Sequence, residues 1–117
     1  MISGIYNITI EQGSTYKLAL YWKNSANQPI DMTGYSAKMQ IRSSTGASVV
    51  LLELSSADSD QIKIYEKQGC VNLTIGYLQT ANLIPSVAVY DLEVKSSEDV
   101  VTKLLKGRCR IEGEVTR

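Results

Sequence analysis

The stretch YSAKMQIR, residues 35–42, alternates apolar and polar side chains at every position. In an extended strand, successive side chains point to opposite sides. One face therefore carries the apolar residues Tyr35, Ala37, Met39 and Ile41, and the other face carries polar ones. This strict alternation predicts a half-buried strand of an antiparallel sheet, because a helix would repeat its apolar positions at every third or fourth residue.

The same period of two recurs along most of the chain. In TYKLALYWK, residues 15–23, Leu18, Leu20 and Trp22 share one face with Tyr16, whereas Tyr21 points outward. Further strands are predicted at residues 5–10, 48–54, 61–65, 70–75, 88–94, 100–106 and 108–115. One segment differs: residues 77–83 fit a short helical turn that ends before Pro85.

Short polar loops separate these segments at the intervals that are typical of all-β domains. We therefore predict an immunoglobulin-like antiparallel β-sandwich of about seven to nine strands, with one short helical turn near residues 77–83. A small barrel would show the same alternation. The 117 residues fit one domain, spanning 1–117.

Charge and composition narrow the possible partners. The twelve basic and twelve acidic residues give a net charge of zero, and there is no basic run, so binding of nucleic acid or of an anionic membrane is not expected. No apolar run is long enough to cross a membrane, and the first residues lack the pattern of a signal peptide. We expect protein partners rather than a small-molecule substrate.

Catalysis is not expected, because the chain contains no histidine, the commonest general base. Two carboxylate pairs remain, Asp91 with Glu93 and Glu112 with Glu114, each on the outward face of a strand. Solvated surface charge is the favoured interpretation of both pairs. A cross-strand ion pair between Glu93 and Lys103 is predicted.

Metal, cofactor and disulfide sites are not expected either. Asp58 and Asp60 offer oxygen ligands, but their loop lacks the glycine and the final glutamate of an EF-hand, so a polar turn is favoured. The two cysteines fall on opposite faces of their strands, which disfavours a disulfide. We predict that Cys109 is buried in the core and that Cys70 is half-exposed.

Several apolar side chains are predicted to point away from the core. Val87 and Val89 lie on the outward face of a strand whose inward face is also apolar, so this strand is either central in its sheet or covered by a partner chain. Outward Tyr21 is a further contact candidate. With the N-terminal arm and the C-terminal residue, the interface candidates are Ile2, Ile5, Tyr21, Val87, Val89 and Arg117.

Four segments together resemble a group of small proteins that tailed bacteriophages and prophages encode. They are EQG (11–13), the turn DMTGY (31–35), the strand YDLEV (90–94) and the ending VTR (115–117). The resemblance covers nearly the whole chain, and departs from the group at Ile84-Pro85, where a glycine-containing turn is commoner.

The resemblance implies a multi-copy virion protein, assembled in the bacterial cytoplasm, that contacts other virion proteins and copies of itself. The implied place is the neck, tail or baseplate, with capsid decoration as an alternative. A carbohydrate-binding or host-surface-binding module that uses exposed tyrosines is a further possibility, and a small hydrolase is disfavoured by the missing histidine.

Overall fold

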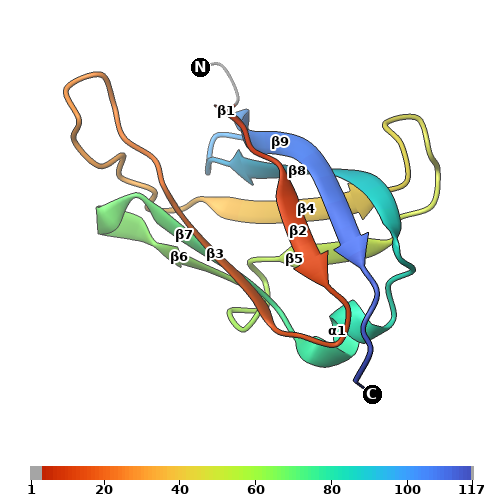
Figure 1. Ribbon diagram of the computed structural model, residues 1–117. Coiled ribbons are helices and arrows are strands. Elements are labelled where there is room, and N and C mark those ends of the chain that lie inside the picture. The colour runs from red at the N-terminus through yellow and green to blue at the C-terminus, as the bar shows by residue number, and fades with distance from the viewer. Residues whose placement is uncertain (1–3, 117) are drawn as a thin grey trace.

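The computed structural model describes residues 4–116. The chain is nearly all-β, with 50% strand and 7% helix, and its two sheets pack against each other (Figure 1). The strands are β1 (Gly4–Ile5), β2 (Ile8–Glu11), β3 (Tyr16–Tyr21), β4 (Ser36–Arg42), β5 (Leu52–Ser55), β6 (Ile62–Tyr65), β7 (Cys70–Ile75), β8 (Ser86–Lys95) and β9 (Val101–Glu112). Two short helices, η1 (Glu66–Gln68) and α1 (Tyr77–Ala81), complete the described elements, and α1 is the predicted helical turn.

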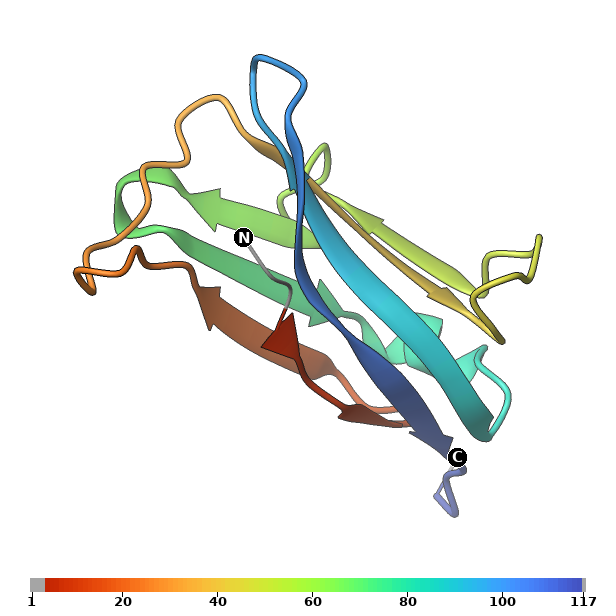
Figure 2. The same cartoon turned by 90° about the horizontal axis from the view of Figure 1, so that it is seen from above.

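The larger sheet has the order β1-β9-β8-β4-β5, with β2 also paired to β9. The smaller sheet has the order β3-β7-β6 and covers one face of the larger one (Figures 1 and 2). Strand β8 is therefore central in its sheet. This is one of the two explanations offered above for a strand with apolar residues on both faces.

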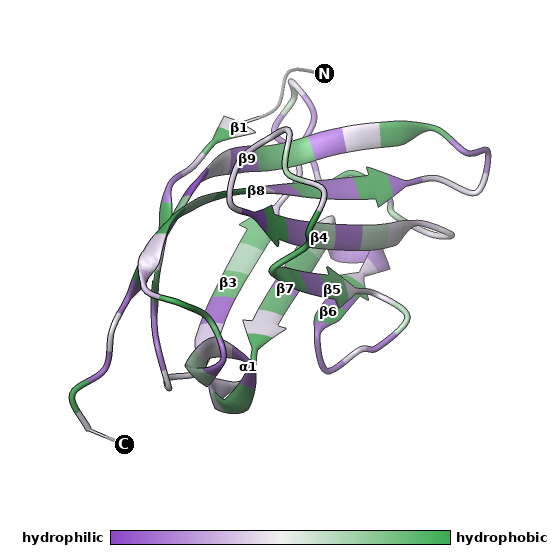
Figure 3. Ribbon diagram, turned by 90° about the vertical axis from the view of Figure 1, so that its right-hand side faces the viewer, coloured by the Kyte–Doolittle hydropathy of each residue, from purple (hydrophilic) through white to green (hydrophobic). Residues whose placement is uncertain are grey.

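The predicted inward faces form the core. In β4, Met39 and Ile41 are fully buried, and in β8 Leu92 and Val94 are as well. The smaller sheet contributes three inward side chains of β7, namely Val71, Leu73 and Ile75. Colouring by hydropathy shows the alternation along β4 and β8 directly (Figure 3). The period of two thus predicted which side chains face inward.

The antiparallel prediction is wrong at one edge of the larger sheet. Strands β1 and β2 both run parallel to β9, with Gly4 beside Leu105 and Ile8 beside Cys109. Side-chain alternation defines the two faces of a strand but not its direction. The first and last strands are joined by the whole domain between them, so no tight turn forces them to be antiparallel.

Strand β9 differs from the two separate strands predicted at 100–106 and 108–115. It is one long strand, and its pairing with β8 shifts register between Leu92 and Glu93. This bulge lets Leu104 and Leu105 both turn inward, and it leaves Lys103 and Lys106 on the outward side. The strand predicted at 48–54 is likewise shorter and begins only at Leu52.

The DMTGY turn leads the chain into β4. The Asp31 carboxylate accepts bonds from the Thr33 backbone N–H (3.0 Å) and hydroxyl (2.6 Å), and it pairs with Lys67 at 2.9 Å. Gly34 has φ 80°, a left-handed conformation that glycine adopts without strain. Tyr35 then packs edge-on against Trp22, with ring centroids 5.9 Å apart.

Asp31 makes the turn sensitive to acid. Hydrogen bonds from Thr33 and then from Lys67 hold the pKa of Asp31 well below its usual range. This stabilisation is present above the unfolded-state pKa and is lost as pH falls through the lower folded-state pKa. We expect Asp31→Asn to lower stability at neutral pH and to flatten its decline between about pH 5 and pH 2. Urea unfolding across this range measures the change.

Asp58→Asn is the matched control, because Asp58 also accepts a backbone N–H in an exposed turn, from Asp60 at 2.9 Å, but has no lysine partner among residues 4–116. An Asp31→Asn profile parallel to that of the wild type would contradict the expectation.

Two side chains, Gln12 and Thr80, hold together the end of the sandwich near α1. The Gln12 amide donates to the Leu83 carbonyl at 2.8 Å, and its oxygen accepts from the Glu114 backbone N–H at 3.2 Å. The buried Thr80 hydroxyl donates to the Ser14 carbonyl at 2.7 Å. Gln12 of the EQG segment thereby joins the end of β2 to the segment after α1 and to the chain after β9, and Ser14 joins it to α1.

Candidate interaction surfaces

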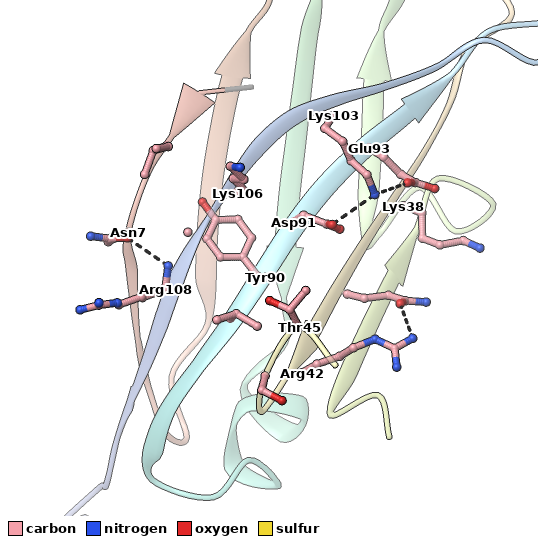
Figure 4. Close-up of a pocket in the computed structure, with 15 residues that line it drawn as sticks. Asn7, Lys38, Arg42, Thr45, Tyr90, Asp91, Glu93, Lys103, Lys106 and Arg108 are labelled. Carbon is pink, nitrogen blue, oxygen red and sulfur yellow. Dashed lines mark hydrogen bonds and ion pairs between the residues drawn. The ribbon is translucent and has the colours of Figure 1, made fainter. Parts of the chain in front are cut away.

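The outward face of the larger sheet is hollowed into a groove of about 890 Å³ (Figure 4). Strands β4, β8 and β9 form its floor, and the loop after β4 supplies Ser44 and Thr45. Five cations line it: Lys38, Arg42, Lys103, Lys106 and Arg108. We refer to this surface as the basic groove.

The basic groove carries more positive than negative charge. Among the described residues that line it, Asp91 and Glu93 are the carboxylates, against five cations. Both bind Lys103, at 3.1 Å and 2.6 Å, so the predicted pair between Glu93 and Lys103 is confirmed. The bond with Glu93, and secondarily that with Asp91, raises the pKa of Lys103. Within residues 4–116 no ion pair forms at the other four lining cations, which leaves a local surplus of positive charge in a chain of zero net charge.

Arg42 is held in place by neutral partners. Its guanidinium donates to the Ala47 carbonyl at 2.7 Å and to the Gln40 side-chain oxygen at 3.0 Å. The Gln40 amide in turn donates to Glu53, just beyond the groove, at 2.8 Å. A fixed guanidinium with neutral partners keeps its charge available to an anionic group.

Arg108 lies on the other side of the floor. Val89 is paired in register with Arg42 on one strand and with Arg108 on the other, so an apolar side chain separates the two guanidinium-bearing positions. The Arg108 backbone N–H donates to Asn7 at 3.0 Å (Figure 4). The groove therefore combines apolar and cationic contacts within one concave surface.

Sequence reasoning missed this groove. Its signal was present, because the outward positions of two strands are basic: Lys38 and Arg42 in one, and Lys106, Arg108 and Arg110 in the other. These positions alternate with inward residues, so they form no continuous basic run. Only the pairing of both strands with β8 brings them to one face.

Two of the remaining candidate carboxylates, Glu112 and Asp58, have ordinary structural partners. Glu112 pairs with Arg110 at 3.5 Å, and the Asp58 carboxylate accepts the Asp60 backbone N–H, as in a polar turn. Within the described part of the chain no group of three or more histidine, cysteine, aspartate or glutamate side chains could hold a metal ion.

The predicted interface residues do not form one surface. Ile5 is 75% exposed and lines the basic groove, together with half-buried Val89. Val87 is 62% exposed on the same face of β8, outside the groove lining, and Tyr21 is 60% exposed on the smaller sheet. Ile2 and Arg117 lie outside the described residues.

Exposed apolar side chains also lie on α1 and in the segment that follows it. Tyr77 and Leu78 of the helix are exposed, as is Ile84 in the segment that leads to β8. Val87 follows at the start of that strand. We call Tyr77, Leu78, Ile84 and Val87 the α1 patch. Sequence reasoning identified only Val87, because residues 77–83 were assigned to a short helical turn without an assignment of its exposed side chains.

The prediction that Cys70 is half-exposed is wrong. Cys70 does lie on the outward face of the smaller sheet, but it is paired in register with Tyr21 on one side and Tyr65 on the other. Its exposed fraction is 3%, and its thiol donates to Asn72 at 3.3 Å. Two large neighbours thus cover a small side chain that alternation alone places in solvent.

Both cysteines are free and buried. Burial raises the pKa of the Cys109 thiol to about 11. Since the thiolate is the reactive form, we expect Cys109 in the native protein to react with a disulfide reagent at pH 8 on the order of a hundredfold more slowly than in urea. Reaction with Ellman's reagent measures this, with Cys70→Ser isolating the Cys109 signal. Rapid native reaction of that variant would contradict the buried placement.

No protein-family model matches this chain, and no curated protein matches it significantly. Among the described residues no helix is both long enough and apolar enough to cross a membrane.

Proposed function

We propose that this protein is a non-enzymatic structural component of a tailed-bacteriophage virion, present in many copies at the neck, tail or baseplate. In this proposal the fold is an immunoglobulin-like sandwich that acts through protein contacts. The observation that carries the contact role is the α1 patch, where Tyr77, Leu78, Ile84 and Val87 are each more than half exposed. Large apolar side chains that stay exposed along one short segment of the chain suit a protein interaction site.

The roles of the segments that carry the resemblance support this proposal. DMTGY forms the turn into β4, and EQG ties the segment after α1 to β2 and to the chain after β9. YDLEV supplies core side chains and outward carboxylates to the central strand β8. A resemblance carried by such segments favours a shared fold, and the virion role rests on that resemblance.

A carbohydrate-binding or host-surface-binding role is the second candidate. Tyr21 and Tyr65 lie two strands apart on the outward face of the smaller sheet, on either side of Cys70, and both rings are exposed. Exposed aromatic rings can stack on the apolar face of a sugar. Binding to a glycan panel that is lost in Tyr21→Ala would favour this role.

Immunolabelling of purified particles tests the virion proposal. We expect an antibody against this chain to label one vertex or the tail in negative stain. Label over the whole head would instead indicate capsid decoration. Particles without label, from a stock whose host lysate contains the chain, would overturn the virion role and leave the glycan-binding role as the first candidate.

A further inference from the structure

Acidic and basic side chains gather in different parts of the structure, although the net charge of the chain is zero. At the end of the sandwich where β4 begins, the loops 31–35, 56–61 and 96–100 and the helix η1 come together: the Gly34 backbone N–H donates to the Glu66 carboxylate, and Ser36 pairs with Lys95. These segments hold the six carboxylates of Asp31, Asp58, Asp60, Glu66, Glu98 and Asp99. Three cations lie beside them, Lys63, Lys67 and Lys95, so the six carboxylates are in excess. Lys67 binds Asp31 and Lys95 binds Asp99. This acidic end faces away from the cationic part of the basic groove around Arg42 and Arg108.

One acidic element protrudes. The β8–β9 hairpin extends beyond the neighbouring strands (Figures 2 and 3). Its tip, residues 96–100, carries Glu98, Asp99 and Val100, and Val101 follows at the start of β9. Both valines are more than half exposed. Asp99 pairs with Lys95, whereas no cation pairs with Glu98 among residues 4–116. The tip thus presents carboxylate and apolar groups side by side.

The shape of the tip is fixed before any contact. The Ser96 hydroxyl accepts bonds from the backbone N–H groups of Glu98 and Val100, at 3.2 Å and 3.1 Å. The Ser96 backbone N–H also donates to the Val100 carbonyl at 2.9 Å. A tip that is already ordered loses little conformational entropy on binding.

The basic groove is complementary to this tip in both charge and polarity. It offers Arg42, Lys106 and Arg108 to the carboxylates, and Val89 and Ile5 to the valines. We propose that the β8–β9 hairpin tip of one copy docks in the basic groove of the next copy. The contact joins two different surfaces, so repeating it generates a ring where the rotation closes and a filament where it does not.

This inference rests on the proposed multi-copy role and specifies a contact between copies. Its occupant is another copy of the chain because the complementary charge is present in the same sequence, whose net charge is zero. A free polyanion such as single-stranded nucleic acid would match the cations of the groove. It would leave Ile5, Val89 and the protruding acidic tip without a role.

Sedimentation velocity of the purified chain over a concentration series, in about 10 mM and about 1 M salt, tests the contact. We expect self-association in low salt and its loss in high salt. Arg108→Glu in the groove and Glu98→Arg at the tip should each weaken association at least about tenfold, because each replaces attraction with repulsion. Lys17→Glu, an exposed change on the smaller sheet with the same charge reversal as Arg108→Glu, is the matched control and should associate as the wild type does.

The decisive sample is an equimolar mixture of Arg108→Glu and Glu98→Arg. In the mixture, the arginine tip meets the glutamate groove, and the unchanged tip meets the unchanged groove. Association should therefore return, although each variant alone associates more weakly than the wild type. Thermal unfolding of each variant checks that it folds.

Three results would overturn the contact. They are a wild-type chain that is monomeric at both salt concentrations, association that is insensitive to both charge reversals, and a mixture that fails to associate. Binding of a single-stranded oligonucleotide that Arg108→Glu abolishes, without self-association, would make the groove a nucleic-acid site instead. Labelled virions together with a monomeric purified chain would reject this contact and leave the virion role standing.

Discussion

Gly69→Ala is expected to lower the free energy of unfolding by about 3 kcal/mol. Gly69 follows η1 with φ 58°, a left-handed conformation that costs any residue with a Cβ atom. An added Cβ would also lie 2.6 Å from the Trp22 carbonyl oxygen and 2.9 Å from that of Ile30. Backbone atoms cannot rotate away as a flexible side chain can, so the chain itself has to move.

The surrounding hydrogen bonds make that movement costly. The Trp22 backbone N–H donates to the Gly69 carbonyl at 2.7 Å, and the Ile30 N–H donates to the Trp22 carbonyl at 3.0 Å. Displacing Gly69 therefore disturbs the end of β3 and the approach to the DMTGY turn together. A loss of this size corresponds to a fall in melting temperature of roughly 12 °C for a domain of this length.

Urea unfolding measures the loss, with Gly46→Ala as the matched control. Gly46 lies in the loop after β4, where an added Cβ would meet nothing within 4 Å, so its substitution should change stability by less than about 0.5 kcal/mol. If both variants unfold at the same urea concentration, the crowding described at Gly69 is wrong.

The faces of the strands could be predicted from the sequence because they depend on neighbouring residues alone. Met39, Ile41, Leu92 and Val94 follow the period of two, and each is buried in the structure. The DMTGY turn could be predicted for the same reason, since Asp31 and Gly34 act within a few residues of themselves. Local chemistry determines such features.

Features that depend on strand pairing could not be predicted in this way. The parallel partnership of β2 with β9 joins residues about a hundred positions apart, and alternation contains no information on direction. Cys70 illustrates the same limit for burial: its face was predicted correctly, but Tyr21 and Tyr65 cover it from neighbouring strands.

The basic groove shows both limits together. The outward direction of Lys38 and Arg42 follows from alternation within β4, but their proximity to Arg108 requires the strand order β9-β8-β4. The bulge opposite Leu92 and Glu93 adds a further step, because it returns Lys106 to the outward face after two inward leucines. The sequence did contain a signal of this bulge: in KLLK, residues 103–106, two adjacent leucines interrupt the alternation of apolar and polar residues.

Gly107→Ala is expected to detach β1 and β2 from β9 and to lower stability by about 2 to 3 kcal/mol. An added Cβ at Gly107 would overlap the Tyr6 carbonyl oxygen and lie 2.8 Å from its carbon. That oxygen accepts a hydrogen bond from the Tyr90 hydroxyl, which crosses the position of the missing side chain. Burial raises the pKa of Tyr90 above its usual range, so the hydroxyl keeps its proton and remains a donor.

Hydrogen exchange resolved by residue distinguishes detachment from general destabilisation. We expect Gly107→Ala to raise exchange first at β2, whose pairing with β9 runs from Ile8 to Glu11, while β4 and β8 stay protected. Gly113→Ala is the matched control. An added Cβ there would lie 3.4 Å from the Pro85 ring, an ordinary contact distance, and the φ angle of Gly113 is one that alanine adopts without strain.

Detachment of β1 would also reach the basic groove, because Ile5 and Asn7 line it and Asn7 accepts the Arg108 backbone N–H. Tyr90→Phe separates the two contributions: it removes the hydrogen bond to Tyr6 but adds no bulk, so it should cost only about 1 kcal/mol and leave β2 protected. If Tyr90→Phe exposes β2 as fully as Gly107→Ala does, the hydrogen bond and not the close approach at Gly107 holds the parallel edge. Unchanged exchange at β2 in both variants would show that neither contact holds it.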